Sequence, residues 1–242
     1  MIISREKNFI FFCNGKTGTT SIEFALKKCG DKPREGKPLL KKHFTPSEAK
    51  HLIPIEQWES AFKFVFVRNP YDWFVSQWFH NFRTKYRPDT NNPILNTLLR
   101  AKKFRRGFKK KMGRRRHTLT SKTLFTADDV RFLHDFLTTH FYRSPQNNTS
   151  FQGRYIVDPE NNQLVDFIGR YESLQEDFDY ITNNIGVEVT LPLINSSSHL
   201  DYRSYFTEES ANEVYNLWKK DFEILGYSKN LDDKQQTTAK TS

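Results

Sequence analysis

The sequence predicts an α/β protein in which a central, mainly parallel β-sheet is flanked by helices. Two apolar runs, 8–13 (NFIFFC) and 62–67 (FKFVFV), are typical of short buried strands. A polar loop and a segment with helical periodicity follow each run, and such alternation is typical of parallel sheets covered by helices. With 242 residues, 36% of them hydrophobic and 22 of them phenylalanine, the chain is long enough to enclose such a sheet.

The first strand leads through the loop 14–21 into the first helix. Apolar residues recur at helical spacing between residues 22 and 29, which predicts a helix with one buried face. Gly30 and Asp31 end this helix. The loop lies at the carboxyl end of a strand, where open parallel sheets bind their ligands.

Capping signals predict where the next two helices begin. The tetrapeptide 45–48 (TPSE) contains a capping threonine, a proline at the first helical position and a glutamate that completes a capping box. His43 lies two residues before it. Directly after the second strand, Asn69 and Pro70 give a similar signal for another helix.

The rest of the chain continues the alternation. The predicted elements are a helix over 126–141, strands over 154–157 and 164–168, and helices over 172–183 and 207–225. Residues 84–122 show no periodicity and are interpreted as a basic insertion, and the polar residues 228–242 as a disordered tail. We therefore expect a single domain over residues 1–227.

The first loop, FFCNGKTGTTS (11–21), contains Gly-Lys-Thr, the end of the ATP-binding Walker A motif. That motif would need a glycine at residue 10, where this chain has Ile10 inside the strand. What remains is one lysine and four hydroxyl side chains before a helix, which favours an anion site. The alternatives are a flexible turn with a helix cap, and a nucleotide kinase or triphosphatase with a degenerate loop.

The second loop adds an arginine. Arg68 directly follows the second strand, and Ser76 lies eight residues later in the next helix. Both could reach one anion near the sheet edge, because arginine is suited to planar recognition of phosphate. Asp72, Ser76 and His80 share a polar strip of that helix. The alternative is a structural ion pair for Arg68 and a solvated position for Ser76.

Together, the two loops resemble those of the 3′-phosphoadenosine 5′-phosphosulfate (PAPS)-dependent sulfotransferases, in particular the carbohydrate-type sulfotransferase family. Residues 16–21 (KTGTTS) resemble the family's 5′-phosphosulfate-binding loop, and 62–78 (FKFVFVRNPYDWFVSQW) its 3′-phosphate-binding segment. Weaker resemblances cover 41–50, 165–178 and 191–207. The resemblance implies a three-layer, P-loop-like fold.

The resemblance also implies the chemistry. PAPS would donate a sulfuryl group to an acceptor hydroxyl of a carbohydrate or glycolipid by in-line displacement. Lys16 would stabilise the bridging oxygen as adenosine 3′,5′-bisphosphate leaves, and Arg68 and Ser76 would hold the 3′-phosphate. The other implied donor-binding residues are Thr17, Gly18, Thr19, Thr20 and Ser21 around the 5′-phosphate, Tyr171 near the adenine, and Arg203 in the C-terminal motif. Gly15 stands where the family often has proline, so we expect a looser loop.

The acceptor hydroxyl must lose a proton. His43 is the candidate base, because histidine titrates near neutral pH. It could instead be a loop histidine that only packs near the Thr45 cap. Glu48 is the alternative base, although its capping position already explains it. We see no cluster of metal ligands in the sequence and expect no metal.

The net charge of +10 is concentrated in residues 100–116 (RAKKFRRGFKKKMGRRR), termed the basic segment below. It holds 11 of the 38 Lys/Arg and no acid, so the other 27 Lys/Arg and the 28 Asp/Glu leave −1 elsewhere. It could dock an acidic or sulfated glycan, contact nucleic acid or an anionic membrane surface, or only raise solubility. As a partner we rank nucleic acid below a glycan.

The expected localisation rests on the lack of a signal peptide and of a membrane-spanning segment in the sequence. Residues 1–7 are charged and no segment approaches 18 uninterrupted apolar residues, so we expect no signal peptide and no membrane span. Family members that act on glycans in secretory compartments usually carry a membrane anchor. We therefore expect a cytoplasmic enzyme of bacterial type, in which Cys13 and Cys29 are free thiols.

Overall fold

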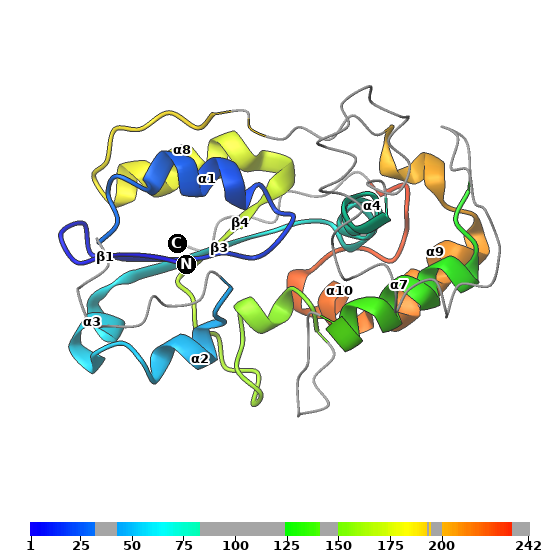
Figure 1. Ribbon diagram of the computed structural model, residues 1–242, viewed down its shortest axis with the longest axis horizontal. Helices are drawn as coiled ribbons and strands as arrows, with labels where there is room; N and C mark the ends of the chain where they lie inside the picture. Colours follow the sequence, from blue (N-terminus) through cyan, green and yellow to red (C-terminus); the bar gives the residue numbers. More distant parts are fainter. Residues whose placement is uncertain (32–42, 83–123, 141–149, 193, 195–199, 234–242) are drawn as a thin grey trace, which may run out of the picture.

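A computed structural model describes residues 1–31, 43–82, 124–140, 150–192, 194 and 200–233 (Figure 1). Within these residues, one sheet has the strand order β1-β2-β3-β4. The strands are β1 (Ile2–Ser4), β2 (Phe9–Phe12), β3 (Phe62–Val67) and β4 (Phe167–Arg170). The last three are parallel, which confirms the predicted mainly parallel sheet.

The edge strand β1 was not predicted. It pairs antiparallel with β2, with Ile2 opposite Phe11 and Ser4 opposite Phe9. A strand of three residues is too short to show a period in the sequence, and only the presence of β2 beside it makes it a strand. It covers the edge of β2 and leaves the carboxyl end of that strand free for the first loop.

Helices lie on both faces of the sheet, so the predicted three layers are confirmed (Figure 1). One face is covered by α1 (Thr19–Leu26) and α8 (Leu174–Asn184), and the other by α2 (Pro46–Lys50) and α3 (Ile55–Ser60). The alternation of β2 explains this arrangement, because Phe9 and Phe11 pack with α1 and α8 while Ile10 and Phe12 join the opposite core.

A second group of helices lies beyond the carboxyl end of the strands (Figure 1). It contains α4 (Pro70–Phe82), α7 (Ala127–His140), α9 (Glu208–Leu217), α10 (Lys219–Leu225) and the short η4 (Tyr202–Tyr205). Aromatic residues hold it together: the Phe74 ring lies edge-on to Phe125 and Trp218, at centroid distances of 5.0 and 5.7 Å. This group lies beside the two predicted loops (Figure 1).

Two predicted elements differ in kind in the structure, and the strand predicted over 164–168 is observed three residues later as β4 (Phe167–Arg170). Residues 154–157 were expected to form a strand, but a 3₁₀ helix, η2 (Gly153–Tyr155), occupies this position, because the preceding N–H groups bond to the Asp221 carboxylate. The predicted helix 207–225 is broken at Trp218 (φ −107°, ψ 15°) into α9 and α10. The break directs the fully buried Asp221 toward η2.

Several predictions lie outside the described residues. These are most of the loop 31–43, the insertion 84–122 with its basic segment, and residues 234–242 of the expected tail. The two helix starts predicted from capping residues lie within the described residues, and both are confirmed. Thr45 caps α2 in a complete capping box with Glu48, and the Asn69 side chain accepts a hydrogen bond from the backbone N–H of Tyr71 at the start of α4.

Candidate active site

The first loop, 14–21, connects β2 to α1. Lys16 (φ 70°) and Gly18 (φ 76°) both have left-handed backbones. A side chain at Gly18 would also lie 2.9 Å from Cδ2 of Leu174, so this position requires glycine. Among the described residues, the backbone N–H groups of residues 15–20 have no acceptor. Unpaired N–H groups at a helix N-terminus are a binding site for anions.

Three of the four predicted hydroxyl groups hold the loop itself together. Thr17 and Thr19 both donate to the carbonyl of Asn14, the former at 2.9 Å. Ser21 donates to the carbonyl of Ile194 at 3.3 Å. Each hydroxyl has a single proton to donate. Besides the Lys16 ammonium, the donors of this loop that are left for an anion are therefore the backbone N–H groups and the exposed Thr20.

Lys16 is half-buried beside a second cation. Burial lowers the pKa of Lys16, and the positive charge of Arg68 lowers it further. The Lys16 carbonyl also accepts a hydrogen bond from Nη1 of Arg68 at 3.2 Å. Two like charges in one region disfavour each other, and a bound anion would relieve this repulsion.

Arg68 is fixed from several sides. Its Nε and Nη2 atoms each lie 2.8 Å from the Asp72 carboxylate, and its side chain is 4% exposed. Its guanidinium carbon lies 4.0 Å from the ring centroid of Tyr171. The structural ion pair that the sequence left open is therefore present. Of the five guanidinium N–H groups, one on Nη1 and one on Nη2 are not engaged by described residues.

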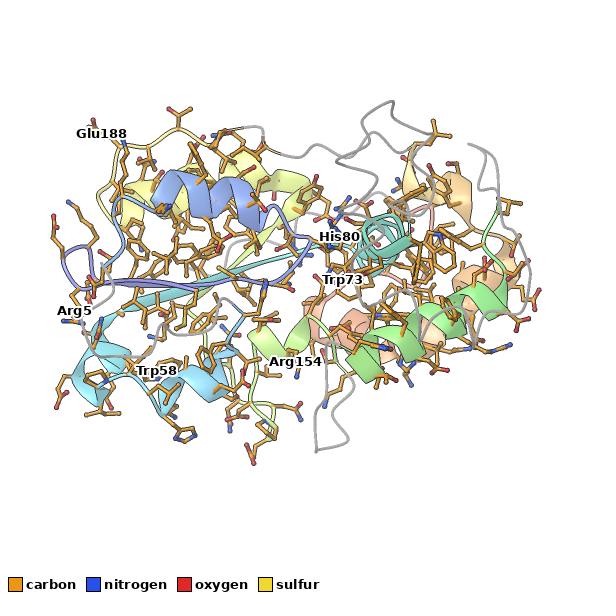
Figure 2. The ribbon with its side chains drawn as sticks, viewed as in Figure 1. Arg5, Trp58, Trp73, His80, Arg154 and Glu188 are labelled. Atoms are coloured by element: carbon orange, nitrogen blue, oxygen red, sulfur yellow. The ribbon has the colours of Figure 1, made fainter. Side chains whose placement is uncertain are left out.

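Ser76 and His80 follow Asp72 on successive turns of α4. Ser76 is buried, and its hydroxyl has no hydrogen-bond partner within the described ranges. His80 lies on the side of α4 that faces the first loop (Figure 2). Partial burial and the charge of Lys16 lower its pKa. The polar strip predicted for this helix therefore faces the cations.

His43 is positioned directly beside the first loop. Its Nδ1 atom lies 2.8 Å from the carbonyl oxygen of Cys13. Because a carbonyl can only accept, we assign the proton to Nδ1, which leaves Nε2 free to take a proton. Glu48, in contrast, accepts from both the backbone N–H and the hydroxyl of Thr45. The capping box therefore occupies Glu48, while His43 is exposed and available.

Tyr171 connects the two loops. It lies on η3 (Tyr171–Ser173), under the Arg68 guanidinium, and its Cδ2 atom is 3.5 Å from the position of a Cβ at Gly18. Arg203 is not brought into this group by any contact among the described residues. It pairs with Asp201 at 3.1 Å and donates to the carbonyl of Leu231 at 3.0 Å.

Sequence reasoning missed residues that hold the loops from behind. The Trp73 indole donates to the Gly15 carbonyl at 2.9 Å, which ties down the loop that was expected to be loose (Figure 2). Glu172 accepts from the backbone N–H of Asn69 at 2.7 Å. Trp73 had been one apolar residue among many. A hydrogen bond from its indole leaves no trace in periodicity, so no signal could have found it.

No metal site was found in the part of the chain that the structure describes. There, no three His, Cys, Asp or Glu side chains are grouped closely enough to hold an ion. The site consists instead of cations, unpaired N–H groups and a histidine.

The structure is that of an α/β protein with a mainly parallel sheet, in which a loop with unpaired N–H groups follows β2 and a buried arginine follows β3. The Sulfotransferase family matches residues 1–228, and the chain belongs to this family. Carbohydrate sulfotransferase 11 of Rattus norvegicus and that of Mus musculus are each 27% identical over 181 residues, or 70% of this chain and 48% of theirs. The chain thus spans about half the length of these curated relatives. No solved structure matches it.

The expectation of a cytoplasmic, bacterial-type enzyme is wrong. The curated relatives are proteins of rat and mouse, which are eukaryotes. The expectation depended on the lack of a membrane anchor in the sequence. Because this sequence spans about half the length of its relatives, nothing follows from where it begins or ends. In the described ranges, no helix is long and apolar enough to cross a membrane.

Proposed function

We propose that this chain transfers a sulfuryl group from PAPS to a hydroxyl group of a carbohydrate. Family membership supports sulfuryl transfer, and the names of the relatives support a carbohydrate acceptor. The choice of donor is supported by one observation: the first loop, with its unpaired N–H groups, and the Arg68 guanidinium both lie against Tyr171. A nucleotide with phosphates on both 5′ and 3′ oxygens would present one phosphate to each.

In this proposal the first loop holds the 5′ end of the donor. The unpaired N–H groups of residues 15–20 bind the 5′-phosphate, and the Lys16 ammonium neutralises the charge that develops on the bridging oxygen. The two unused N–H groups of Arg68 and the Ser76 hydroxyl bind the 3′-phosphate. Tyr171 supplies an aromatic surface for the adenine.

The transfer step forms a bond between the acceptor oxygen and sulfur and breaks the bond between sulfur and the bridging phosphate oxygen. The proton of the acceptor hydroxyl passes to Nε2 of His43, which is free because Nδ1 is bonded to the Cys13 carbonyl. Positioning and electrostatics provide the rate acceleration, as in phosphoryl transfer. A kinase reading is not favoured, because the position of the first Walker glycine is Ile10, a fully buried residue of β2.

Calorimetry and a transfer assay test the proposal together. Adenosine 3′,5′-bisphosphate should bind much more tightly than ATP, and labelled PAPS should transfer label to at least one member of a panel of carbohydrate acceptors. Lys16→Ala should reduce this turnover by about 10²–10³-fold, the usual effect of removing one transition-state donor. Tighter binding of ATP would contradict the proposal, and full turnover of Lys16→Ala would contradict the role of the lysine.

A further inference from the structure

The fully buried side chain of Gln152 contacts both loops of the site. Its Oε1 atom accepts from the backbone N–H of Arg68 at 3.0 Å and from Nδ2 of Asn14 at 3.3 Å. Its Nε2 atom donates to the carbonyl of Arg68 at 2.9 Å. Asn14 is the first residue of the loop 14–21, and Arg68 is the cation of the second loop. One amide group therefore joins the starts of both anion sites.

This amide continues the sheet where the strands have ended. The register of β2 and β3 ends with Phe12 opposite Val65. Beyond it, Asn14 donates from its side chain to the carbonyl of Phe66 at 3.0 Å, and Gln152 bonds both the N–H and the carbonyl of Arg68, as a neighbouring strand would. The relative position of the two loops is thus set by directional bonds.

Gln152 is itself held by a buried acid. The Asp221 carboxylate, from α10, accepts from the Ser150 hydroxyl at 2.6 Å and from three consecutive backbone N–H groups, those of residues 151–153, at 2.8–2.9 Å. A Cβ at Gly153 would collide with the Ser150 side chain and lie 2.7 Å from Cδ1 of Ile224. Residue 153 must therefore be glycine for the backbone to lie this close to α10. Burial raises the pKa of Asp221, and the four donors act in the opposite direction.

Filling a core with such a network costs more desolvation free energy than filling it with apolar side chains. A fully buried carboxylate and two buried amides lose their hydration, which apolar side chains of the same size would not require. Buried polar networks instead specify one geometry when their members are bonded, and here Asp221 and both polar atoms of the Gln152 side chain are bonded, while Oδ1 of Asn14 has no partner among the described residues. The geometry specified here is the separation of two sites that a single ligand must reach together.

We propose that Gln152 is a positioning residue that couples the two phosphate-binding loops, with Asp221 as its anchor. The inference rests on the proposed function, because it takes a nucleotide with a phosphate at each loop as the ligand. The second phosphate of such a ligand binds with a high effective concentration only when the spacing of the sites matches the ligand. Loss of Gln152 therefore weakens the coupling between the sites more than it weakens either site.

The test compares one bisphosphate with two monophosphates. Calorimetry gives the affinities of adenosine 3′,5′-bisphosphate, 3′-AMP and 5′-AMP for the wild type and for Gln152→Met, which keeps the length of the side chain and removes its three bonds. We expect the bisphosphate to lose at least about tenfold more affinity than either monophosphate, about 1.4 kcal/mol of coupling. Gln57→Met, in α3 at the opposite end of β3, is the matched control and should change none of the three.

Gln152→Glu provides a second variant if Gln152→Met does not fold. It keeps an acceptor for Arg68 N–H and Asn14 but places a carboxylate oxygen against the Arg68 carbonyl, so the bisphosphate should again lose most. Equal losses for all three nucleotides, or no loss, in a folded variant would overturn the coupling role. If the wild type itself does not prefer the bisphosphate, the proposed function fails, and the coupling fails with it.

Discussion

At the scale of single residues, Lys16 and Arg68 concentrate positive charge at the carboxyl ends of β2 and β3. Lys16 has a left-handed backbone, which costs about 1–3 kcal/mol for a residue with a side chain. Arg68 is held by Asp72, Tyr171 and the Lys16 carbonyl. Backbone strain and neighbouring like charges are typical of binding sites, where the bound ligand offsets their free-energy cost.

The lowered pKa of Lys16 predicts an alkaline limit to donor binding. The ammonium should lose its proton below pH 10.5, its ordinary pKa, because burial and Arg68 both disfavour the charge. The affinity for adenosine 3′,5′-bisphosphate should therefore fall as pH rises through that lowered pKa. The stability contribution has the opposite sign, since the unfolded chain binds the proton more tightly in this window and stability rises with pH.

Calorimetric titration between pH 7 and 10.5 measures the limit, and Lys16→Arg is the control. A guanidinium stays charged over this range, so the alkaline limb should disappear in that variant even if its affinity is lower overall. An unchanged limb in Lys16→Arg would assign it to a different group.

His43 predicts an effect on rate. His43→Gln should lower kcat by about 10²–10⁴-fold, because Nε2 no longer accepts the acceptor proton. Affinity for adenosine 3′,5′-bisphosphate should be unchanged, since no bond to the donor is lost. A variant that loses donor affinity in parallel with kcat would show that His43 only supports the loop through Cys13.

At the scale of elements, the short helix α2 should matter through its cap. Thr45 closes a capping box with Glu48 only two residues after His43. Thr45→Ala should cost about 1 kcal/mol of unfolding free energy and also lower kcat, because the chain that presents His43 loses its anchor. Urea denaturation and turnover assays measure the two effects.

A matched control exists on α7, where Thr126 and Asp129 form the same reciprocal pair. Thr126→Ala should lose similar stability and leave kcat unchanged. If both variants lower kcat equally, general destabilisation and not the position of His43 is the cause.

At the scale of the whole molecule, the charge distribution predicts how the acceptor is captured. We expect the affinity for a polysulfated glycan to fall steeply with salt, because bound cations release counterions from a polyanion. Replacing the 11 Lys/Arg of the basic segment by Gln should flatten this dependence. Affinity measured from 50 to 500 mM salt checks the prediction, with a neutral glycan as control. A flat response in the wild type would leave the segment only a role in solubility.

The sequence by itself determined the strands and helix starts that are encoded by neighbouring residues in the chain. Apolar runs predicted β2 and β3, proline and capping residues predicted the starts of α2 and α4, and Arg68 directly after the second apolar run indicated the second loop. These signals are local, because each arises from neighbours in the chain. They sufficed for the fold class and for the positions of Lys16 and Arg68 after neighbouring strands, whereas Arg203 lies apart from them with Asp201 and Leu231.

Only the tertiary structure decided how those residues are held. The strand β1 exists because β2 lies beside it, and η2 begins where Asp221 binds the N–H groups of residues 151–153. Gln152 joins two loops that precede it in sequence by 138 and 84 residues. Such bonds follow from which distant segments are brought together, and no local pattern records them. A single acid on the apolar side of the last helix, Asp221, was the one visible sign, since a buried charge requires partners.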